Sequence, residues 1–201
     1  MIEVFADIGC PFTHIGLRRF VERRADLGRD DVLLRVRAWP LEVVNGKPLD
    51  PHFIAEEIDD IRGQAAPDLF AGFQEASFPA TSLPAMALAA AAAEQGPGVG
   101  ERVSLALRDL LFEQGVDIAD ETVLRRLAAD HGVPWETVDV QRVLDDRTEG
   151  AERGVIGSPH FFTPAGDFFC PALDVSRDEN GQLRVVADTE AFERFLAICF
   201  S

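Results

Sequence analysis

The sequence predicts an α/β domain that is interrupted by an all-helical insertion. Short apolar runs with strand character occur near both ends of the chain, whereas the long middle stretch carries only helical patterns. No period repeats along the chain, which argues against a solenoid. We therefore expect residues 1–49 and 151–201 to form one α/β domain, with residues 50–150 as a helical insertion domain.

The N-terminal part has the pattern of a β-α-β unit. Residues 2–6 form a short apolar run typical of a buried strand, and residues 32–39 are β-branched and partly alternating. Between them, apolar residues recur at helical spacing over residues 11–27. Pro11 suits the first turn of this helix because its missing N–H would have no partner there. A crossover of this kind places the two strands parallel in one sheet.

The middle segment carries a series of helix starts and stops. Asp-Pro and Ser-Leu-Pro signals begin helices, and turns that contain glycine end them. The expected helices begin near Asp50, Ser82, Val99, Asp120 and Val133.

Strand character returns after the helical segment. A turn at residues 164–167 separates two short strands, residues 160–163 and 168–170, which predicts a β-hairpin. A second turn at residues 178–181 lies between strand-like pieces, and residues 188–199 predict a terminal amphipathic helix. The strands on both sides of the helical segment are expected to pair in a single sheet.

The composition excludes several function classes. Lys and Arg total 19 and Asp and Glu total 35, for a formal charge of −16, so the surface repels nucleic acids and anionic membranes. The N-terminus lacks the pattern of a signal peptide, and the longest apolar stretch, residues 83–93, is too short to span a bilayer. The three cysteines form neither a disulfide framework nor a metal-ligand spacing. We therefore expect a cytoplasmic protein with no metal, no nucleic-acid partner and no membrane partner.

Cys10, in Cys10-Pro11-Phe12-Thr13-His14, is the strongest candidate for chemistry because it stands where a strand meets a helix. Free N–H groups and the helix dipole stabilise an anion there, and they can lower a thiol pKa from about 8.5 to roughly 3.5–7.5. We expect Thr13, one turn on, to donate a hydrogen bond to the sulfur. We expect His14 to supply positive charge or to carry a proton. The alternative is a buried, inert cysteine at a helix start.

The dipeptide Ser158-Pro159, with glycines upstream, precedes the predicted hairpin. A cis peptide bond at this position would leave the backbone groups of Ser158 facing an adjacent cysteine. His160 follows directly and is a candidate to face Cys10. The alternative is a trans proline that begins an edge strand.

Taken together, the Cys-Pro-x-x motif at the first helix and the Gly-Val-x-Gly-Ser-Pro motif before the hairpin resemble the DsbA family of thioredoxin-fold proteins. Within it, the chain resembles the branch of FrnE-type oxidoreductases, 2-hydroxychromene-2-carboxylate isomerases and kappa-class glutathione transferases. The resemblance extends over nearly the whole chain. It implies a thioredoxin-like fold with a helical insertion, in which Pro159 is the cis-proline.

The resemblance also implies roles for individual residues. Cys10 matches the nucleophilic first cysteine of the family's Cys-Pro-x-Cys motif, and Thr13 stands where redox members have the resolving cysteine. The isomerases and kappa transferases have serines at both places, where the first hydroxyl orients the thiol of bound glutathione. Their Gly-Ser-Asp segment, which holds the glutamyl end of glutathione, is replaced by Phe-Cys-Pro-Ala-Leu at residues 169–173. Substrate or thiol binding is assigned to Pro11, Phe12, Asn45, Ser158, Pro159 and His160. The implied cosubstrate is glutathione or another low-molecular-weight thiol, and we expect no tightly bound cofactor.

Thr13 cannot resolve a mixed disulfide, so efficient dithiol chemistry within the motif is excluded. The leading hypothesis is a DsbA-family oxidoreductase or isomerase that acts on a small-molecule substrate through Cys10 as a single nucleophilic thiol. One alternative is a kappa-like enzyme in which a bound low-molecular-weight thiol is the nucleophile; another is a redox-inactive binding or chaperone-like module. Cys170 is expected to be a packed core residue rather than a distant resolving thiol, and Cys199 a structural one. The resemblance also leaves a homodimer open.

Overall fold

The computed structural model describes the whole chain, residues 1–201. Its strands are β1 Ile2–Ala6, β2 Leu34–Ala38, β3 His160–Thr163, β4 Gly166–Phe169, β5 Leu173–Arg177 and β6 Leu183–Ala187. Its α-helices are α1 Pro11–Asp26, α2 Leu41–Val44, α3 Pro51–Gln64, α4 Leu83–Glu94, α5 Pro97–Phe112, α6 Glu121–Asp130, α7 Val140–Glu152 and α8 Thr189–Cys199. Two short 3₁₀ helices occur at Glu75–Ser77 and Trp135–Thr137. The second of these precedes α7, which is why α7 begins at Val140 rather than near Val133.

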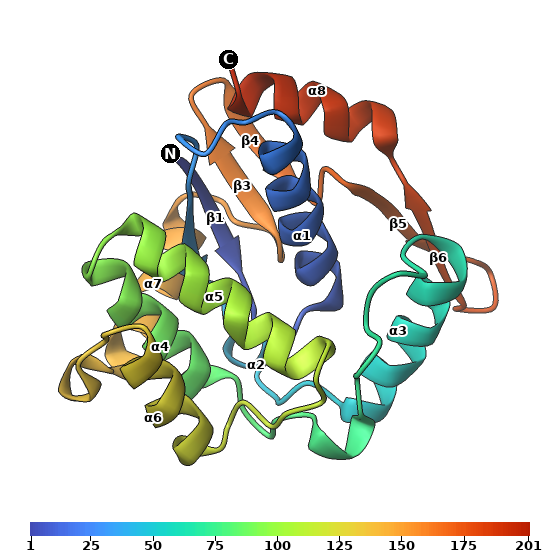
Figure 1. Cartoon of the computed structure of the whole chain (residues 1–201). Coiled ribbons are helices and arrows are strands. Elements are labelled where there is room, and N and C mark those ends of the chain that lie inside the picture. The colour runs from blue at the N-terminus through green and yellow to red at the C-terminus, as the bar shows by residue number, and fades with distance from the viewer.

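Strands from both sides of the helical segment form one mixed sheet in the order β2-β1-β3-β4 (Figure 1). β1 runs parallel to β2, with Ile2 opposite Leu34, and antiparallel to β3, with Phe5 opposite His160. β4 pairs with β3 through the predicted hairpin. The α/β fold with a helical insertion is therefore confirmed.

The two faces of this sheet contact different helices because side chains alternate along each strand. Val4 of β1 and Phe161 of β3 are buried against residues of α1 and α8. Phe5 points to the opposite face and packs with Trp39. Gly150 of α7 lies so close to Trp39 that a Cβ on it would be 2.9 Å from the indole ring. The sheet is thus enclosed on both faces, with α1 crossing in front of it and α8 above in Figure 1.

β2 is an edge strand, and two carboxylates accept hydrogen bonds from its N–H groups. Leu34 donates to Glu101 Oε2 at 2.5 Å, and Ala38 donates to Asp146 Oδ2 at 2.9 Å. Glu101 on α5 also accepts two hydrogen bonds from Arg24 on α1, at 2.7 and 2.8 Å. An unpaired edge is a template for pairing with another chain. These bonds therefore occupy part of the edge and fix α5 and α7 against it.

α4 and α5 pack closely in the helical segment. A Cβ on Gly100 of α5 would lie 2.8 Å from the Cβ of Ala93 on α4, so this approach requires a glycine facing an alanine. The alanine-rich sequence of α4 permits such a short distance between helices. None of the helices has the length and apolar character needed to cross a membrane.

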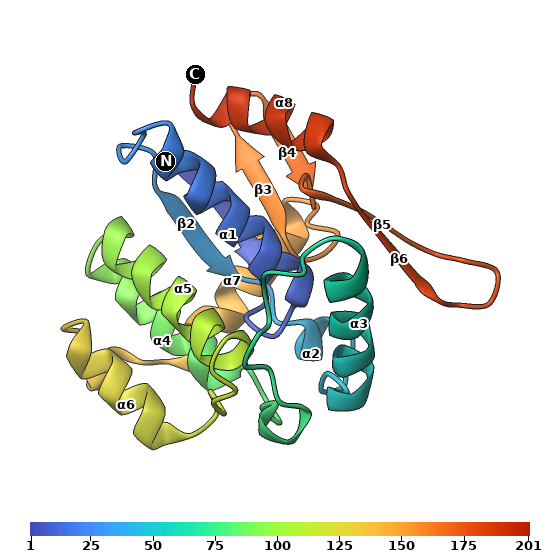
Figure 2. The ribbon, with the colours of Figure 1, turned by 45° about the vertical axis from the view of Figure 1, so that its right-hand side comes forward.

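β5 and β6 form a separate two-stranded antiparallel sheet, which projects beside α3 (Figure 2). The expectation that all strands belong to one sheet is therefore wrong for this pair. The amide of Gln64 on α3 provides a physical reason. It donates to the carbonyl oxygen of Leu183 at 3.1 Å and accepts from the N–H of Val185 at 3.0 Å, so a helix side chain bonds backbone groups of β6.

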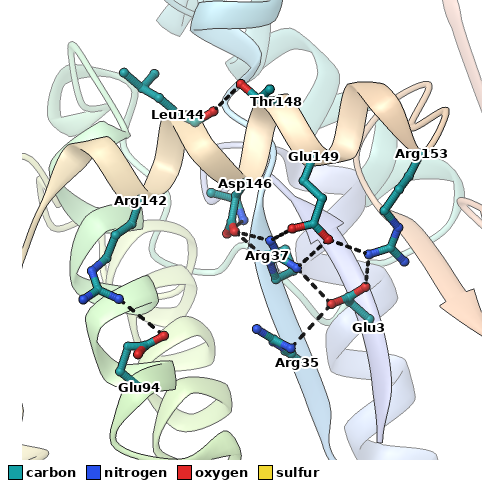
Figure 3. Close-up of polar contacts among 11 residues, drawn as sticks. Glu3, Arg35, Arg37, Glu94, Arg142, Leu144, Asp146, Thr148, Glu149 and Arg153 are labelled. Atoms are coloured by element: carbon teal, nitrogen blue, oxygen red, sulfur yellow. Dashed lines mark hydrogen bonds and ion pairs between the residues drawn. The ribbon is translucent and has the colours of Figure 1, made fainter.

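An ion-pair network joins α7 to the sheet (Figure 3). Arg37 on β2 donates to Asp146 at 2.6 Å and to Glu149 at 2.6 Å, both on α7. The same guanidinium reaches Glu3 on β1 at 3.1 Å, and Arg153 pairs with Glu3 and Glu149. The side chain of Arg37 is 12% exposed, so solvent screens these contacts less than it screens ordinary surface pairs.

Candidate active site

Cys10 is the N-cap residue of α1, four residues beyond the end of β1. Its thiol donates a hydrogen bond to the carbonyl oxygen of Ser158, with Sγ and O 3.3 Å apart. The peptide bond between Ser158 and Pro159 is cis, as the family resemblance implies. The two motifs, which are 148 residues apart in the chain, therefore meet at a single contact.

The expected lowering of the Cys10 pKa is wrong. Cys10 is 3% exposed, and burial raises the pKa of its thiol. Hydrogen bonds from the side chain and backbone of Thr13 and from Ser158 act in the opposite direction, and the nearby charge of Asp7 raises the pKa further. The helix N-terminus supplies the N–H groups that the sequence predicts, but the loss of solvation outweighs them. The resting site therefore holds a protonated thiol.

Thr13 and Ser158 form a pair of hydroxyl groups beside the sulfur. Their oxygens are 2.7 Å apart, and the backbone N–H of Asp7 donates to Ser158 Oγ at 2.8 Å. Both hydroxyls are buried, and both favour the ionised form of Cys10. The interaction of Thr13 with the cysteine agrees with the sequence-based expectation, although Thr13 also shares its hydroxyl with Ser158.

His14 does not supply positive charge. Its ring is 1% exposed and packs between Phe70 and Phe112, with ring centroids 5.3 and 5.0 Å away. Burial lowers the pKa of His14, so the neutral ring uses Nε2 to donate to Glu113 Oε1 at 2.7 Å. His14 thus fastens α1 to the end of α5, and this contact replaces the proton-carrying role expected from the sequence.

Of the remaining predicted residues, two lie in the first turn of α1 next to Cys10 and two lie elsewhere. Pro11 is buried in the first turn of α1, and Phe12 is partly buried against the main core cluster. His160 stacks on Phe162 on the face opposite Phe161, and its Nε2 pairs with Asp167 Oδ2 at 3.0 Å. Asn45 is exposed at the end of α2. The structure therefore brings neither His160 nor Asn45 to the sulfur of Cys10.

Two buried charged residues beside Cys10 were missed by the sequence analysis. Asp7 is fully buried and accepts hydrogen bonds from the N–H groups of Gly9 and Leu41, at 2.7 and 2.6 Å. Arg108 on α5 is also fully buried and donates to the carbonyl oxygen of Asp7 at 3.1 Å. It also donates to the hydroxyl of Ser104 at 2.6 Å, while its Nε has no hydrogen-bond partner.

The charges of these two residues act on each other and on Cys10. Burial raises the pKa of Asp7 to about 6, partly offset by its two backbone N–H donors and by Arg108. Burial lowers the pKa of Arg108 to about 10, while the negative charges of Asp7 and Cys10 raise it. Both residues carried a signal in the sequence. Asp7 directly follows an apolar strand, and Arg108 lies with Ser104 and Leu111 on the buried side of its helix.

The site is covered rather than open. Gly9 has Leu49 and Phe78 so close that a Cβ on Gly9 would lie 3.1 and 3.3 Å from them. Cys10, Thr13 and His14 are each at most 3% exposed, so none of their side chains is open to solvent. No group of three or more His, Cys, Asp or Glu residues is placed to hold a metal ion.

The other two cysteines are also free and buried. Cys199 on α8 packs in the cluster that contains Phe20 and Phe195, and burial raises its pKa to about 12. Cys170 follows β4, and its backbone N–H donates to the carbonyl oxygen of Pro159 at 3.0 Å. Cys170 therefore lies beside the same cis dipeptide as Cys10.

Comparison with known proteins supports the fold. The cytosolic disulfide reductase DsbM from Pseudomonas aeruginosa matches with a TM-score of 0.58 and 15% identity, over 98% of this chain and 96% of that chain. A structure of the same reductase with GSH gives a TM-score of 0.60 at 15% identity, again over 98% and 96% of the two chains. A 2-hydroxychromene-2-carboxylate isomerase matches with a TM-score of 0.62 and 13% identity, over 84% of this chain and 87% of that chain. The comparison with curated proteins found no match.

The family comparison agrees with these structures. The model of the DSBA-like thioredoxin domain matches residues 1–177, which include Cys10, the helical segment and the cis-proline. The resemblance inferred from the two motifs is thereby confirmed, and with it the thioredoxin-like fold. The chain belongs to the family of DSBA-like thioredoxin domains.

Proposed function

We propose that the protein is a thiol-dependent oxidoreductase or isomerase that acts on a small molecule through Cys10. The observation that carries this proposal is the 3.3 Å contact between Cys10 Sγ and the carbonyl oxygen of Ser158, beside the cis peptide bond. A substrate sulfur that adds to Cys10 would meet the same backbone groups of Ser158. Two of the similar structures are a disulfide reductase and an isomerase, which supports this class of chemistry.

Cys10 reacts as a thiolate, although its resting form is the protonated thiol. In the oxidoreductase reaction, Cys10 loses its proton and attacks one sulfur of a low-molecular-weight disulfide, RSSR. The S–S bond breaks, and the departing thiolate takes up a proton to become RSH. Because Thr13 cannot attack the resulting mixed disulfide, another thiol must resolve it. The raised pKa of Cys10 means that this reaction accelerates with pH throughout the range in which Cys10 ionises.

A second candidate is an enzyme of the kappa type, in which a bound low-molecular-weight thiol is the nucleophile and Cys10 assists. The hydroxyl pair of Thr13 and Ser158, 2.7 Å apart, favours this candidate because it offers neutral donors to a bound thiolate. The DsbM structure with GSH makes glutathione the first thiol to test. We further propose that either reaction takes place in the cytoplasm, where low-molecular-weight thiols keep cysteines reduced.

The test is to incubate the protein with oxidised glutathione at several pH values and to map the adducts by mass spectrometry. We expect a glutathione adduct on Cys10, formed faster as the pH rises, and none at that position in Cys10→Ser. Cys199→Ser is the matched control and should react like the unsubstituted protein. A folded protein whose Cys10 stays unmodified at every pH contradicts the leading proposal. Glutathione binding that survives in Cys10→Ser, measured by calorimetry, supports the second candidate.

A further inference from the structure

Cys10 and Cys170 approach the cis dipeptide from two sides. The thiol of Cys10 bonds to the carbonyl oxygen of Ser158, and the backbone N–H of Cys170 bonds to the carbonyl oxygen of Pro159 at 3.0 Å. His160 pairs with Phe169 in the β3–β4 register, so extending that register by one pair places Cys170 opposite Pro159. Both cysteines therefore contact the same dipeptide.

Cys170 is buried beside Pro159, on the side of the sheet that faces α1. Phe161 and Phe168, which are paired across β3 and β4, both pack in the cluster that contains residues of α1. Pro159 itself lies against this helix, since a Cβ on Gly16 of α1 would be 3.6 Å from its Cγ. Cys170 is 8% exposed and belongs to the buried cluster that includes Ile15 of α1. Cys10 and Cys170 are therefore both buried where α1 meets the cis dipeptide.

Electrostatics supports this proximity. Burial raises the pKa of Cys170 to about 12, and the negative charge of ionised Cys10 contributes to that rise. The two sulfurs are thus close enough to interact when Cys10 is ionised. The charge of Cys10 does not contribute to the raised pKa of Cys199 on α8, which burial alone raises.

We propose that Cys170 is the resolving thiol for Cys10, so that the two form a redox pair across the cis-proline in place of a Cys-x-x-Cys motif. The inference rests on the proposed function, because it requires a mixed disulfide at Cys10. In the first step, Cys10 attacks RSSR and releases RSH, as described above. In the second step, Cys170 loses its proton and attacks Cys10 Sγ, the bond from Cys10 to the RS group breaks, and RS⁻ takes up a proton as RSH. Two protein thiols are oxidised, and one RSSR is reduced to two RSH.

The chemistry fixes the order of these steps, because Cys170 can displace the RS group from Cys10 only after the mixed disulfide has formed. The mixed disulfide carries no charge at Cys10, so no thiolate opposes the ionisation of Cys170 in the second step. A disulfide requires the two Cα atoms to be within about 7 Å. β4 ends at Phe169, and Cys170 has a φ of 44°, a backbone conformation that non-glycine residues rarely adopt, so the chain leaves the strand direction beside the cis dipeptide.

The experiment exploits the positions of the arginines. Trypsin places the three cysteines on separate peptides, residues 1–18, 154–177 and 195–201. The reduced protein is incubated with oxidised glutathione, quenched with acid at successive times and mapped without reduction. The variants are Cys170→Ser, Cys170→Ala as a second replacement, and Cys199→Ser as the matched control. Circular dichroism establishes that each variant is folded.

We expect a disulfide between peptides 1–18 and 154–177 in the unsubstituted protein and in Cys199→Ser. In both Cys170 variants the glutathione adduct on Cys10 should persist about tenfold longer, because no internal thiol removes it. An adduct that is equally long-lived with and without Cys170, with no linked peptides, overturns this inference and leaves the proposed function standing. If Cys10 forms no adduct in any variant, the proposed function fails and this inference fails with it.

Discussion

Cys10 is subject to two opposing influences on its ionisation. The first turn of α1 offers N–H groups, and Thr13 and Ser158 offer hydroxyls, all of which favour the thiolate. Burial removes water from the same sulfur and favours the thiol. Burial prevails in the resting structure, so reactivity depends on whatever changes the surroundings of the sulfur. Asp7 is one such group, because its carboxylate raises the pKa of Cys10 and because its own pKa of about 6 lies near neutral pH.

Replacing Asp7 with asparagine should make Cys10 more acidic. Ionised Asp7 raises the pKa of Cys10, so the Cys10 thiol of Asp7→Asn should react severalfold faster with iodoacetamide at pH 7. The rate is measured in a background in which Cys170 and Cys199 are replaced by serine, so that only Cys10 can react. Asp167→Asn, which removes a carboxylate on His160 instead, is the control and should not change this rate. Because the pKa of Asp7 is about 6, the difference should vanish below that pH, where Asp7 is already neutral. An equal alkylation rate at pH 7 would contradict the coupling.

Asp7 should also affect stability in a defined direction. The pKa of Asp7 is raised from 3.8 to about 6 on folding, so the folded state binds this proton more tightly than the unfolded state does. The resulting contribution of Asp7 to the free energy of unfolding is complete below pH 3.8 and is lost as the pH rises through 6. In Asp7→Asn the free energy of unfolding should lose this pH dependence, because an amide does not titrate. The amide has one oxygen, so it accepts only one of the two N–H hydrogen bonds that the carboxylate oxygens of Asp7 accept.

The sequence locates the candidate site but not the environment of its side chains. The strand-to-helix junction locates Cys10 from local chain chemistry, whereas the cis form of Pro159 is implied only by the resemblance of the two motifs to the DsbA family. Exposure depends on what packs over the site, and Leu49 and Phe78 come from distant segments with no local signal. The same limit explains why His14 was assigned a charge: its neighbours Phe70 and Phe112 are supplied by the helical segment.

At the scale of elements, α5 determines much of the site. From this one helix, Glu101 bonds to β2, Arg108 reaches the carbonyl oxygen of Asp7, and Glu113 accepts a hydrogen bond from His14. These residues are spaced so that α5 contacts the sheet edge, the buried turn before α1 and α1 itself. A shift of α5 would therefore move the charges around Cys10 without any change in the Cys-Pro-x-x motif.

Glu113→Gln should lower the free energy of unfolding more at neutral pH than in acid. Burial alone would raise the pKa of Glu113, but bonds from His14 and from the N–H groups of Phe70 and Ala71 lower it from 4.5 to about 2. This contribution is therefore present above pH 4.5 and is lost as the pH falls toward 2. We expect a loss of about 2 kcal/mol in the free energy of unfolding at pH 7, measured with urea, and a smaller difference at pH 3.

Glu121→Gln is the control for this prediction. Glu121 forms an exposed pair with Arg125 on α6, so its replacement should cost less than about 1 kcal/mol at any pH. A Glu113 variant that loses the same stability at pH 3 as at pH 7 would show that its carboxylate is not held in the ionised form.

The elements themselves were largely predictable, but one pairing was not. Helix starts at Pro11 and Asp50 and the hairpin turn follow from local rules that hold in any context. β5 and β6 also have strand character in the sequence, yet they leave the main sheet because Gln64 of α3 bonds to the backbone of β6. Which sheet a strand joins depends on such distant partners, so strand character alone does not determine it.

At the scale of the whole molecule, the helical segment is built into the sheet rather than appended to it. β1 and β3 are paired although the helical segment lies between them in the chain. Polar bonds then join the two parts, from Glu101 and Asp146 to β2 and from Arg37 to α7, as Figure 3 shows for Arg37. Dividing the chain at residues 50 and 150 into a thioredoxin-like domain and a helical insertion domain remains a proposal. The division does not imply that either part folds without the other.

The two tryptophans allow this cooperativity to be measured. Trp39 packs with Phe5 beside the sheet, and Trp135 lies in the helical segment under the guanidinium of Arg125. Trp39→Phe leaves Trp135 as the only fluorescent reporter, and Trp135→Phe leaves Trp39. Urea unfolding is followed by fluorescence in each of these two backgrounds. We expect a further substitution elsewhere in the chain to shift the urea midpoint equally in both. Arg37→Ala should lower the free energy of unfolding by about 2 kcal/mol in both backgrounds, because it removes the charge that α7 and the sheet share. Arg194→Ala, which breaks an exposed pair on α8, should have little effect in either. If Arg37→Ala lowers only the midpoint reported by Trp135, the helical segment unfolds separately from the sheet, and the molecule is two cooperative units rather than one.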